Sequence, residues 1–183
     1  MRVTVIMLLL WLLLAASDLL AESHTKVSAG IDASALEPGH RALLAVVLDI
    51  PNDLHAQSHR PLDPYAVKCE LTLANVPGIV FGQIEYPKGT EAEFPALGKL
   101  SVYTGRVIIL VPVTPTADAK PGPIKLSGSV QLQVCNGETC FAPEEDDFNV
   151  DTAVADAGTP IDAINKALFP NPATSQPTSE PSK

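Results

Sequence analysis

Four stretches of the chain carry the hydrophobic pattern of β-strands, and together they predict an all-β domain. Residues 66–73 alternate most clearly, with Cys69 and Leu71 on an apolar face and charged or polar residues on the other. The remaining stretches, which are similarly apolar or alternating, are residues 40–50, 105–115 and 124–134. Clusters of Pro and Gly separate the stretches, as expected of turns between short strands. We therefore predict a β-sandwich over residues 26–150.

The chain changes character after this predicted domain. Thr159 and Pro160 suit the cap and the first position of a helix, and the apolar residues that follow lie on one side at helical spacing. We therefore predict a short helix over residues 159–169. Residues 170–183 are rich in Pro, Ser and Thr, which predicts a disordered tail.

Residues 1–21 have the pattern of a signal peptide. Arg2 supplies a positive charge, residues 3–14 form an apolar run, and small residues that suit cleavage after Ser17 or Ala21 follow. The apolar run is shorter than a transmembrane helix needs, although an uncleaved membrane anchor is the alternative interpretation. Because exported proteins meet an oxidising compartment, we expect disulfides to persist in this protein.

Three cysteines occur in the chain, and two of them, Cys135 and Cys140, bracket a four-residue segment. The pair Asn136-Gly137 is a strong signal for a two-residue type I′ turn, which would place Cys135 opposite Glu138. A four-residue loop would instead place the two cysteines opposite each other, at the Cα separation that a disulfide needs. Such a disulfide closes a small ring and would stabilise the fold by only about 2 kcal/mol. Its position therefore indicates a bond that is made and broken.

The chain is acidic overall and also beside these cysteines. Its formal net charge of -9 argues against nucleic acids and anionic membrane surfaces as partners. Residues 144–147 are four consecutive acids, which would disfavour a thiolate close to them. We interpret them either as a solvated loop or as a surface that helps to dock a redox partner.

Seven short stretches between residues 52 and 150 carry a family resemblance. They are His55-Ala56-Gln57-Ser58, Pro61-Leu62-Asp63-Pro64-Tyr65, Glu70-Leu71-Thr72-Leu73, Tyr86-Pro87-Lys88-Gly89, Glu93-Phe94-Pro95-Ala96-Leu97-Gly98, Leu132-Gln133-Val134-Cys135 and Cys140-Phe141-Ala142-Pro143. In this order and spacing, the chain resembles the N-terminal periplasmic domain of the thiol:disulfide interchange protein DsbD. The resemblance implies an immunoglobulin-like sandwich, exported across the inner membrane to the periplasm, that passes reducing equivalents between redox proteins.

The resemblance also implies roles for individual residues. Cys135 and Cys140 match the redox-active pair, and the later cysteine matches the one that attacks substrate disulfides. Glu93 and Phe94 match a cap loop whose Phe shields the disulfide, with a core aromatic as the alternative for Phe94. The implied partners are thioredoxin-like redox proteins, both donor and acceptor, and no cofactor is implied. If active, the chain would be a thiol:disulfide oxidoreductase that serves as an electron-transfer intermediary.

The chain departs from the family pattern in two respects. Where the family often has tyrosines near the cysteine pair, this chain has His55 and Gln57. It also has no transmembrane electron-conducting domain and no thioredoxin-like domain. We therefore expect another polypeptide to supply its electrons, and a membrane to be involved only through that partner or through an uncleaved signal anchor.

Two other functions are compatible with the sequence. An immunoglobulin-like module with a static structural disulfide could bind a protein through the sandwich surface or the terminal helix. A metal-binding domain could use His55, His59 and the two thiols to hold zinc or copper, although the spacing favours no metal. Cys69 is predicted to be a small buried hydrophobic residue. Glu91 and Glu93 are predicted to be surface charges, with tuning of the thiols as the alternative.

Overall fold

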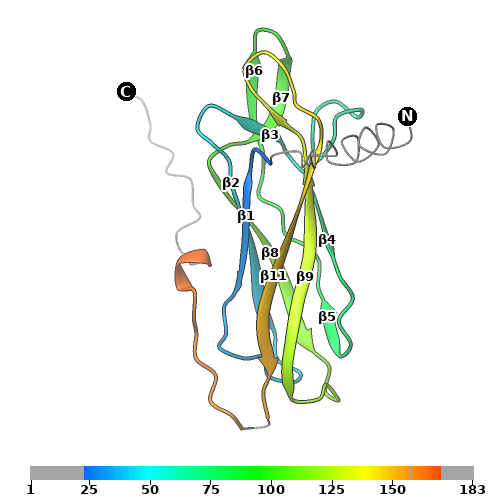
Figure 1. Cartoon of the computed structure of the whole chain (residues 1–183), viewed down its shortest axis with the longest axis vertical. Coiled ribbons are helices and arrows are strands. Elements are labelled where there is room, and N and C mark those ends of the chain that lie inside the picture. Colours follow the sequence, from blue (N-terminus) through cyan, green and yellow to red (C-terminus); the bar gives the residue numbers. More distant parts are fainter. Residues whose placement is uncertain (1–22, 157, 170–183) are drawn as a thin grey trace, which may run out of the picture.

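The computed structural model describes residues 23–156 and 158–169, which form an almost entirely β structure (Figure 1). The strands are β1 (Lys26–Ile31), β2 (Ala42–Asp49), β3 (His55–Gln57), β4 (Glu70–Leu73), β5 (Ile79–Phe81), β6 (Thr90–Phe94), β7 (Gly98–Tyr103), β8 (Arg106–Pro115), β9 (Gly122–Leu132), β10 (Val134–Cys135) and β11 (Glu144–Val154). The helical structure in these two ranges is a single 3-10 turn, η1 (Lys166–Leu168). The described residues therefore contain no helix of the length and hydrophobicity that a bilayer crossing requires.

Two antiparallel sheets face each other and form a sandwich. One sheet has the strand order β1-β2-β8-β5, and the other has the order β11-β9-β4. A third sheet, with the order β10-β3-β7-β6, extends from one end of the sandwich, at the top of Figure 1. The prediction of an all-β, immunoglobulin-like sandwich is confirmed. The third sheet carries the cysteine hairpin and holds it away from the centre of the sandwich.

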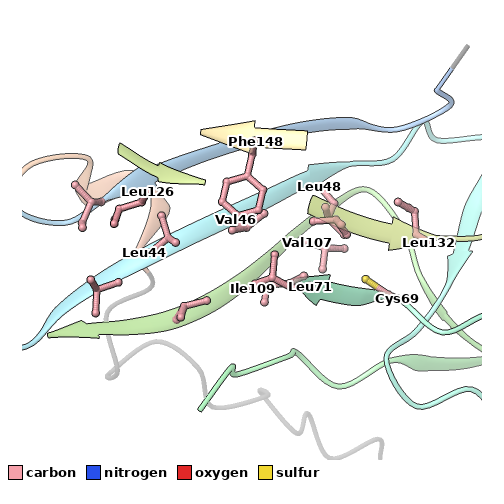
Figure 2. Packing of buried hydrophobic residues seen from close by; sticks show 14 of the residues in the cluster. Leu44, Val46, Leu48, Cys69, Leu71, Val107, Ile109, Leu126, Leu132 and Phe148 are labelled. Carbon is pink, nitrogen blue, oxygen red and sulfur yellow. The ribbon is translucent and has the colours of Figure 1, made fainter. Parts of the chain in front are cut away.

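The hydrophobic core lies between the two sandwich sheets (Figure 2). Leu44 and Ile109 enter it from β2 and β8, while Leu126 and Phe148 enter it from β9 and β11. Along β8, buried residues alternate with exposed or half-exposed ones over the full ten residues, as expected for a strand with one face on the core. Burial of apolar side chains at roughly 25 cal/mol per Å² is the main force that holds the sheets together.

The four predicted stretches all contain strands, but several other strands carry no hydrophobic signal. Residues 66–73 form a shorter strand than expected, because β4 begins only at Glu70. Strand β6 has the polar sequence TEAEF, and β11 begins with the four consecutive acids. These acids pair with β9, from Glu144 opposite Leu132 onwards, so the interpretation of residues 144–147 as a loop is wrong.

The predicted helix over residues 159–169 is also wrong, because this segment is extended and binds back onto the sandwich. Ser34 N donates to the Asp162 carbonyl (2.9 Å), and Ile164 N donates to the Asp32 carbonyl (2.8 Å). These bonds engage the backbone groups that a helix would have used internally, and only the turn η1 is helical. The predicted signal peptide, residues 1–21, and the predicted tail, residues 170–183, lie outside the described residues.

Candidate functional site

Cys135 and Cys140 form a disulfide that closes a hairpin at the edge of the third sheet. The two residues are directly opposite each other, with their Cα atoms 3.9 Å apart. Phe141 N donates to the Val134 carbonyl (2.8 Å), and Asn136 N donates to the Thr139 carbonyl (2.9 Å). The cysteines therefore occupy a non-hydrogen-bonded pair, which is the position in an antiparallel ladder where side chains approach most closely. Of the two predicted arrangements, the four-residue loop is the one that forms.

The side chain of Asn136 holds the loop between the cysteines. Its Oδ1 accepts hydrogen bonds from the backbone N–H groups of Glu138 and Thr139, at 2.8 Å each. Neither Asn136 nor Gly137 adopts the positive φ that a type I′ turn requires. The Asn-Gly signal therefore marks a turn correctly, but Asn136 acts through its side chain rather than through a left-handed backbone.

The two disulfide-bonded residues differ in access to solvent. Cys135 is completely buried, whereas Cys140 is partly exposed. The third cysteine, Cys69, is completely buried in the sandwich core and takes no part in a disulfide. Burial, assisted by the nearby negative charge of Glu70, raises the pKa of the Cys69 thiol to about 12. Cys69 therefore remains a protonated hydrophobic residue at physiological pH and is a poor nucleophile.

The hairpin formed by β6 and β7 places Phe94 on the imidazole of His55. Leu97 N donates to the Phe94 carbonyl (3.1 Å) in the turn, and Gly98 has a φ of 76°, which favours glycine. The rings of Phe94 and His55 are stacked, with centroids 4.0 Å apart and an interplanar angle of 16°. His55 is directly opposite Cys135 where β3 pairs with β10. Phe94, the predicted cap residue, therefore contacts a residue that adjoins the disulfide.

Phe94 itself is half-buried and does not belong to the sandwich core. The adjacent acids, Glu91 and Glu93, are exposed on the same strand. Glu91 pairs with Lys99 at 2.6 Å, and this hydrogen bond and charge lower the pKa of the Glu91 carboxyl. These positions agree with surface charges on an edge strand.

Two polar side chains of β3 are buried beside the cysteine pair. His55 is 4% exposed and Gln57 is 3% exposed. Among the described residues, neither the Nε2 atom of His55 nor the Oε1 atom of Gln57 has a hydrogen-bond partner. Burial lowers the pKa of His55, because an imidazolium loses its hydration in the interior.

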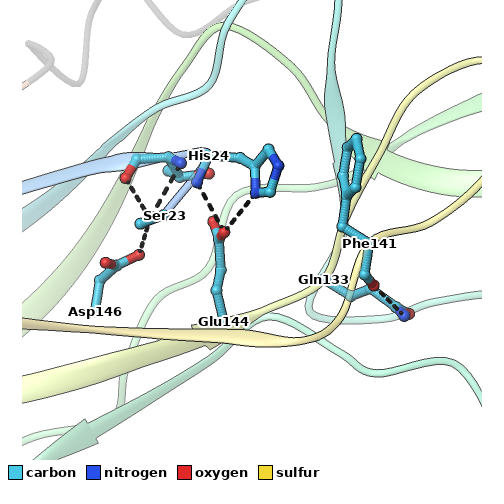
Figure 3. Close-up of polar contacts among 7 residues, drawn as sticks. Ser23, His24, Gln133, Phe141, Glu144 and Asp146 are labelled. Carbon is cyan, nitrogen blue, oxygen red and sulfur yellow. Dashed lines mark hydrogen bonds and ion pairs between the residues drawn. The ribbon is translucent and has the colours of Figure 1, made fainter. Parts of the chain in front are cut away.

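A second stacked pair, which the sequence pattern did not indicate, lies on the other side of the hairpin. The ring of His24 stacks on Phe141, the residue after Cys140, with centroids 4.1 Å apart. His24 also contacts the Oε2 atom of Glu144 through its backbone N–H (2.9 Å) and through Nδ1 (3.2 Å) (Figure 3). Ser23 Oγ donates to Asp146 (2.7 Å), whose carboxyl pKa is raised by burial. The start of the described chain is therefore attached to the strand that leaves the cysteine hairpin.

The described residues give no metal site. They contain no group of three or more His, Cys, Asp or Glu side chains placed to hold an ion. The two histidines considered as ligands have separate contacts, because His55 stacks on Phe94 and His59 stacks on Tyr86. His59 also contacts the Cys69 carbonyl through Nδ1 (2.9 Å).

Comparison with known proteins identifies the family. A family model described as thiol:disulfide interchange protein DsbD, N-terminal, matches residues 23–152. The chain belongs to this family. The matched residues include the whole sandwich, the third sheet and both cysteines of the disulfide. The DsbD N-terminal domain is a periplasmic domain family whose chemistry is thiol:disulfide exchange.

Several solved structures are similar to the chain, whereas no curated protein matches it. The DsbD N-terminal domain of Neisseria meningitidis in the reduced form has 17% identity and a TM-score of 0.41, and the match covers 69% of this chain and 90% of that one. The N-terminal periplasmic domain of ScsB from Proteus mirabilis has 12% identity and a TM-score of 0.49, with coverage of 75% and 51%. The complex of the DsbD and PilB N-terminal domains from Neisseria meningitidis has 18% identity and a TM-score of 0.39, with coverage of 73% and 88%.

Proposed function

We propose that this protein is a thiol:disulfide exchange module that passes reducing equivalents between redox proteins through Cys135 and Cys140. The observation that carries the proposal is the disulfide of a hairpin at the edge of the third sheet, in a chain of the DsbD N-terminal family. Cys140 is partly exposed and Cys135 is completely buried, so Cys140 is the cysteine that a partner would meet first. The small ring means that opening the bond leaves the core intact.

The reaction follows the usual course of thiol–disulfide exchange. In the reduced protein, the Cys140 thiolate attacks a partner disulfide, and a partner thiolate leaves as the mixed disulfide forms. Cys135 then attacks the Cys140 sulfur, which closes the protein disulfide and releases the second partner thiolate. Two electrons pass to the partner, and the reverse sequence reduces the module.

Glu93 and Phe94 belong to the proposed cap of this site. The stacking of Phe94 on His55, together with its place outside the sandwich core, supports a lid that covers the cysteine pair between partners. Such a lid would prevent stray thiols from reacting with the disulfide. Its hairpin pairs with β3 through β7 and is separate from the two sandwich sheets.

The proposed partners are thioredoxin-like redox proteins, one as electron donor and another as acceptor. The proposed compartment is the periplasm, reached with the export signal in residues 1–21. An oxidising compartment requires that electrons be supplied continuously, and we propose that a separate polypeptide supplies them.

The test is the reduction potential of the Cys135–Cys140 pair, measured against glutathione, together with trapping of a mixed disulfide. We expect a potential above about -300 mV, the range of labile disulfides. We also expect the oxidised protein to form a covalent complex with a reduced thioredoxin-like domain that lacks its resolving cysteine. A potential below about -300 mV and no covalent complex would instead indicate a static disulfide in an interaction module.

A further inference from the structure

The cysteine pair lies beside two buried polar atoms, one on His55 and one on Gln57. His55 Nε2 and Gln57 Oε1 are inaccessible to solvent and have no hydrogen-bond partner among the described residues. Burying a polar atom without a partner is costly, so native structures rarely contain two on neighbouring side chains. Their position suggests that a donor appears there in another state of the protein.

The sheet register places these atoms on the side of the disulfide. Cys135 is directly opposite His55, and side chains at opposite positions of an antiparallel pair project from the same face. Gln57 is two residues further along β3 and therefore projects from that face as well. Gln57 and Cys135 therefore occupy diagonal positions, roughly 7–8 Å apart, a distance within reach of a long side chain.

Reduction of the disulfide supplies the missing donors. A disulfide carries no proton, whereas two thiols carry two S–H groups. With the proton of the neutral His55 ring on Nδ1, Nε2 is an acceptor, so two unpaired acceptors in the oxidised form match two new donors in the reduced form. From this match we infer that His55 is the proton acceptor for the Cys135 thiol, with Gln57 as a second acceptor that stabilises the reduced pair. This inference rests on the proposed exchange function and assigns a residue to its second step.

Cys135 resolves the mixed disulfide in a step that conserves protons and electrons. The Cys135 S–H transfers its proton to His55 Nε2, and the resulting thiolate attacks the Cys140 sulfur of the mixed disulfide. The bond between Cys140 and the partner sulfur breaks, and the partner leaves as a thiolate with the electron pair. The imidazolium then returns its proton to the leaving thiolate or to solvent.

The surroundings of His55 suit a neutral base. The residues of β6 and β7 that share its face are apolar or uncharged: Thr90, Ala92, Phe94, Leu100 and Val102. The charged residues of these strands, Glu91, Glu93 and Lys99, alternate onto the opposite face and are exposed. On β10, the titratable residue is Cys135 itself. The lowered pKa of His55 keeps the imidazole uncharged at neutral pH, as a proton acceptor must be.

The test compares His55→Phe with His59→Phe as the matched control. Phe preserves a stacked ring at each position, because His55 stacks on Phe94 and His59 stacks on Tyr86, but it removes the ring nitrogens. Each reduced protein is mixed with a small aromatic disulfide. The first phase of thiol release reports attack by Cys140, and the second reports resolution by Cys135. We expect His55→Phe to slow the second phase at pH 7 at least tenfold and to leave the first phase nearly unchanged.

The pH profile separates proton transfer from a packing effect. In the wild type and in His59→Phe, the second phase should fall at low pH as His55 becomes protonated. In His55→Phe, the rate should follow only the ionisation of the Cys135 thiol. The equilibrium with glutathione should shift tenfold towards the disulfide, or about 30 mV, in His55→Phe. Gln57→Leu should shift the same equilibrium without altering the pH profile, because an amide does not titrate.

One result would contradict the role of His55, and a different result would contradict the proposed exchange function. If the wild type resolves rapidly and His55→Phe has the same rate and pH profile, His55 is not the acceptor. If the wild type itself shows no exchange, the proposed function fails first. If His55→Phe does not fold, an NMR titration of His55 in the oxidised and reduced wild type provides the test. The titration midpoint of His55 should move to lower pH on reduction, since accepting a hydrogen bond favours the neutral ring, and an unchanged midpoint would overturn the inference.

Discussion

The imidazole of His24 stacks on the phenyl ring of Phe141, with an interplanar angle of 14°. A second histidine, His55, stacks on Phe94 on the other side of the cysteine hairpin. The two pairs differ in their polar contacts, because His24 contacts the carboxylate of Glu144 whereas His55 Nε2 has no partner among the described residues. The first pair thus fixes the hairpin to the sandwich, and the second lies between the hairpin and the proposed lid.

The contact between His24 and Phe141 should stabilise the fold measurably. His24→Ala removes the stacking, for which about 0.5–1.5 kcal/mol is typical, and the contact with Glu144. We expect a total loss of about 1–2 kcal/mol in the free energy of unfolding, measured with denaturant. His24→Phe retains the stacked ring and should recover part of this loss. Equal stability of the wild type and His24→Ala would mean that the N-terminal segment does not anchor the hairpin.

The disulfide should contribute little to stability. Because the ring that it closes is short, we expect the reduced protein to remain folded and to be less stable by about 2 kcal/mol. Chemical denaturation of both forms measures the difference. A loss above about 4 kcal/mol would show that the bond is a structural cross-link, since that exceeds the expectation for so short a loop.

Phe94 should control access to the cysteines more than it controls stability. Phe94→Ala should speed alkylation of the reduced pair by a small reagent, with a loss of roughly 1 kcal/mol in stability from the lost stacking. Phe148→Ala is the matched control, because Phe148 is 5% exposed in the sandwich core. That variant should lose about 3–5 kcal/mol and leave alkylation of the folded protein unchanged. The reverse pattern would place Phe94 in the core and not in a lid.

Cys140 should be the attacking cysteine, because it is partly exposed and Cys135 is completely buried. Cys135→Ala should form a stable covalent complex with a thioredoxin-like partner activated as a mixed disulfide. Cys140→Ala should form little or none. A complex formed only by Cys140→Ala would reverse the assignment, and the absence of a complex with either variant would favour the static interaction module.

The buried His55 should make the protein less stable in acid. Its pKa is lowered from 6.5 in the folded state, so the unfolded chain binds the additional proton first. The contribution of His55 to stability is therefore fully present above pH 6.5 and declines as the pH falls through the folded-state pKa. Denaturation at a series of pH values between 7 and 5 should show this decline in the wild type and a smaller one in His55→Phe. Parallel curves for the two proteins would contradict it.

The sandwich was predictable from the sequence because its central strands bury one face or both. Strand β8 alternates between buried and more exposed residues along its length, and β2 is a continuous apolar run, as expected of central strands. Strand β6 and the start of β11 were not predictable in this way. Their polar side chains face solvent or bind other polar groups, so pairing with a neighbouring strand decides their conformation.

The candidate site was predictable in part. The spacing of Cys135 and Cys140 was sufficient to propose the disulfide. The environment of His24 could not be inferred, because its partners Phe141 and Glu144 are more than a hundred residues away in the chain. The predicted helix over residues 159–169 failed for a related reason. Its local capping signals were outweighed by hydrogen bonds to residues that follow β1.

The extended segment after β11 changes how the sandwich meets other proteins. Strand β1 is at the edge of its sheet, and residues 162–168 lie against its end, where Asn165 Nδ2 donates to the Ile31 carbonyl (2.9 Å). Unpaired strand edges recruit strands from other chains and promote aggregation. By occupying this end of β1, the chain's own C-terminal region blocks self-association there. The third sheet, which carries the cysteine hairpin, lies beyond the end of the sandwich and is left uncovered by this segment (Figure 1).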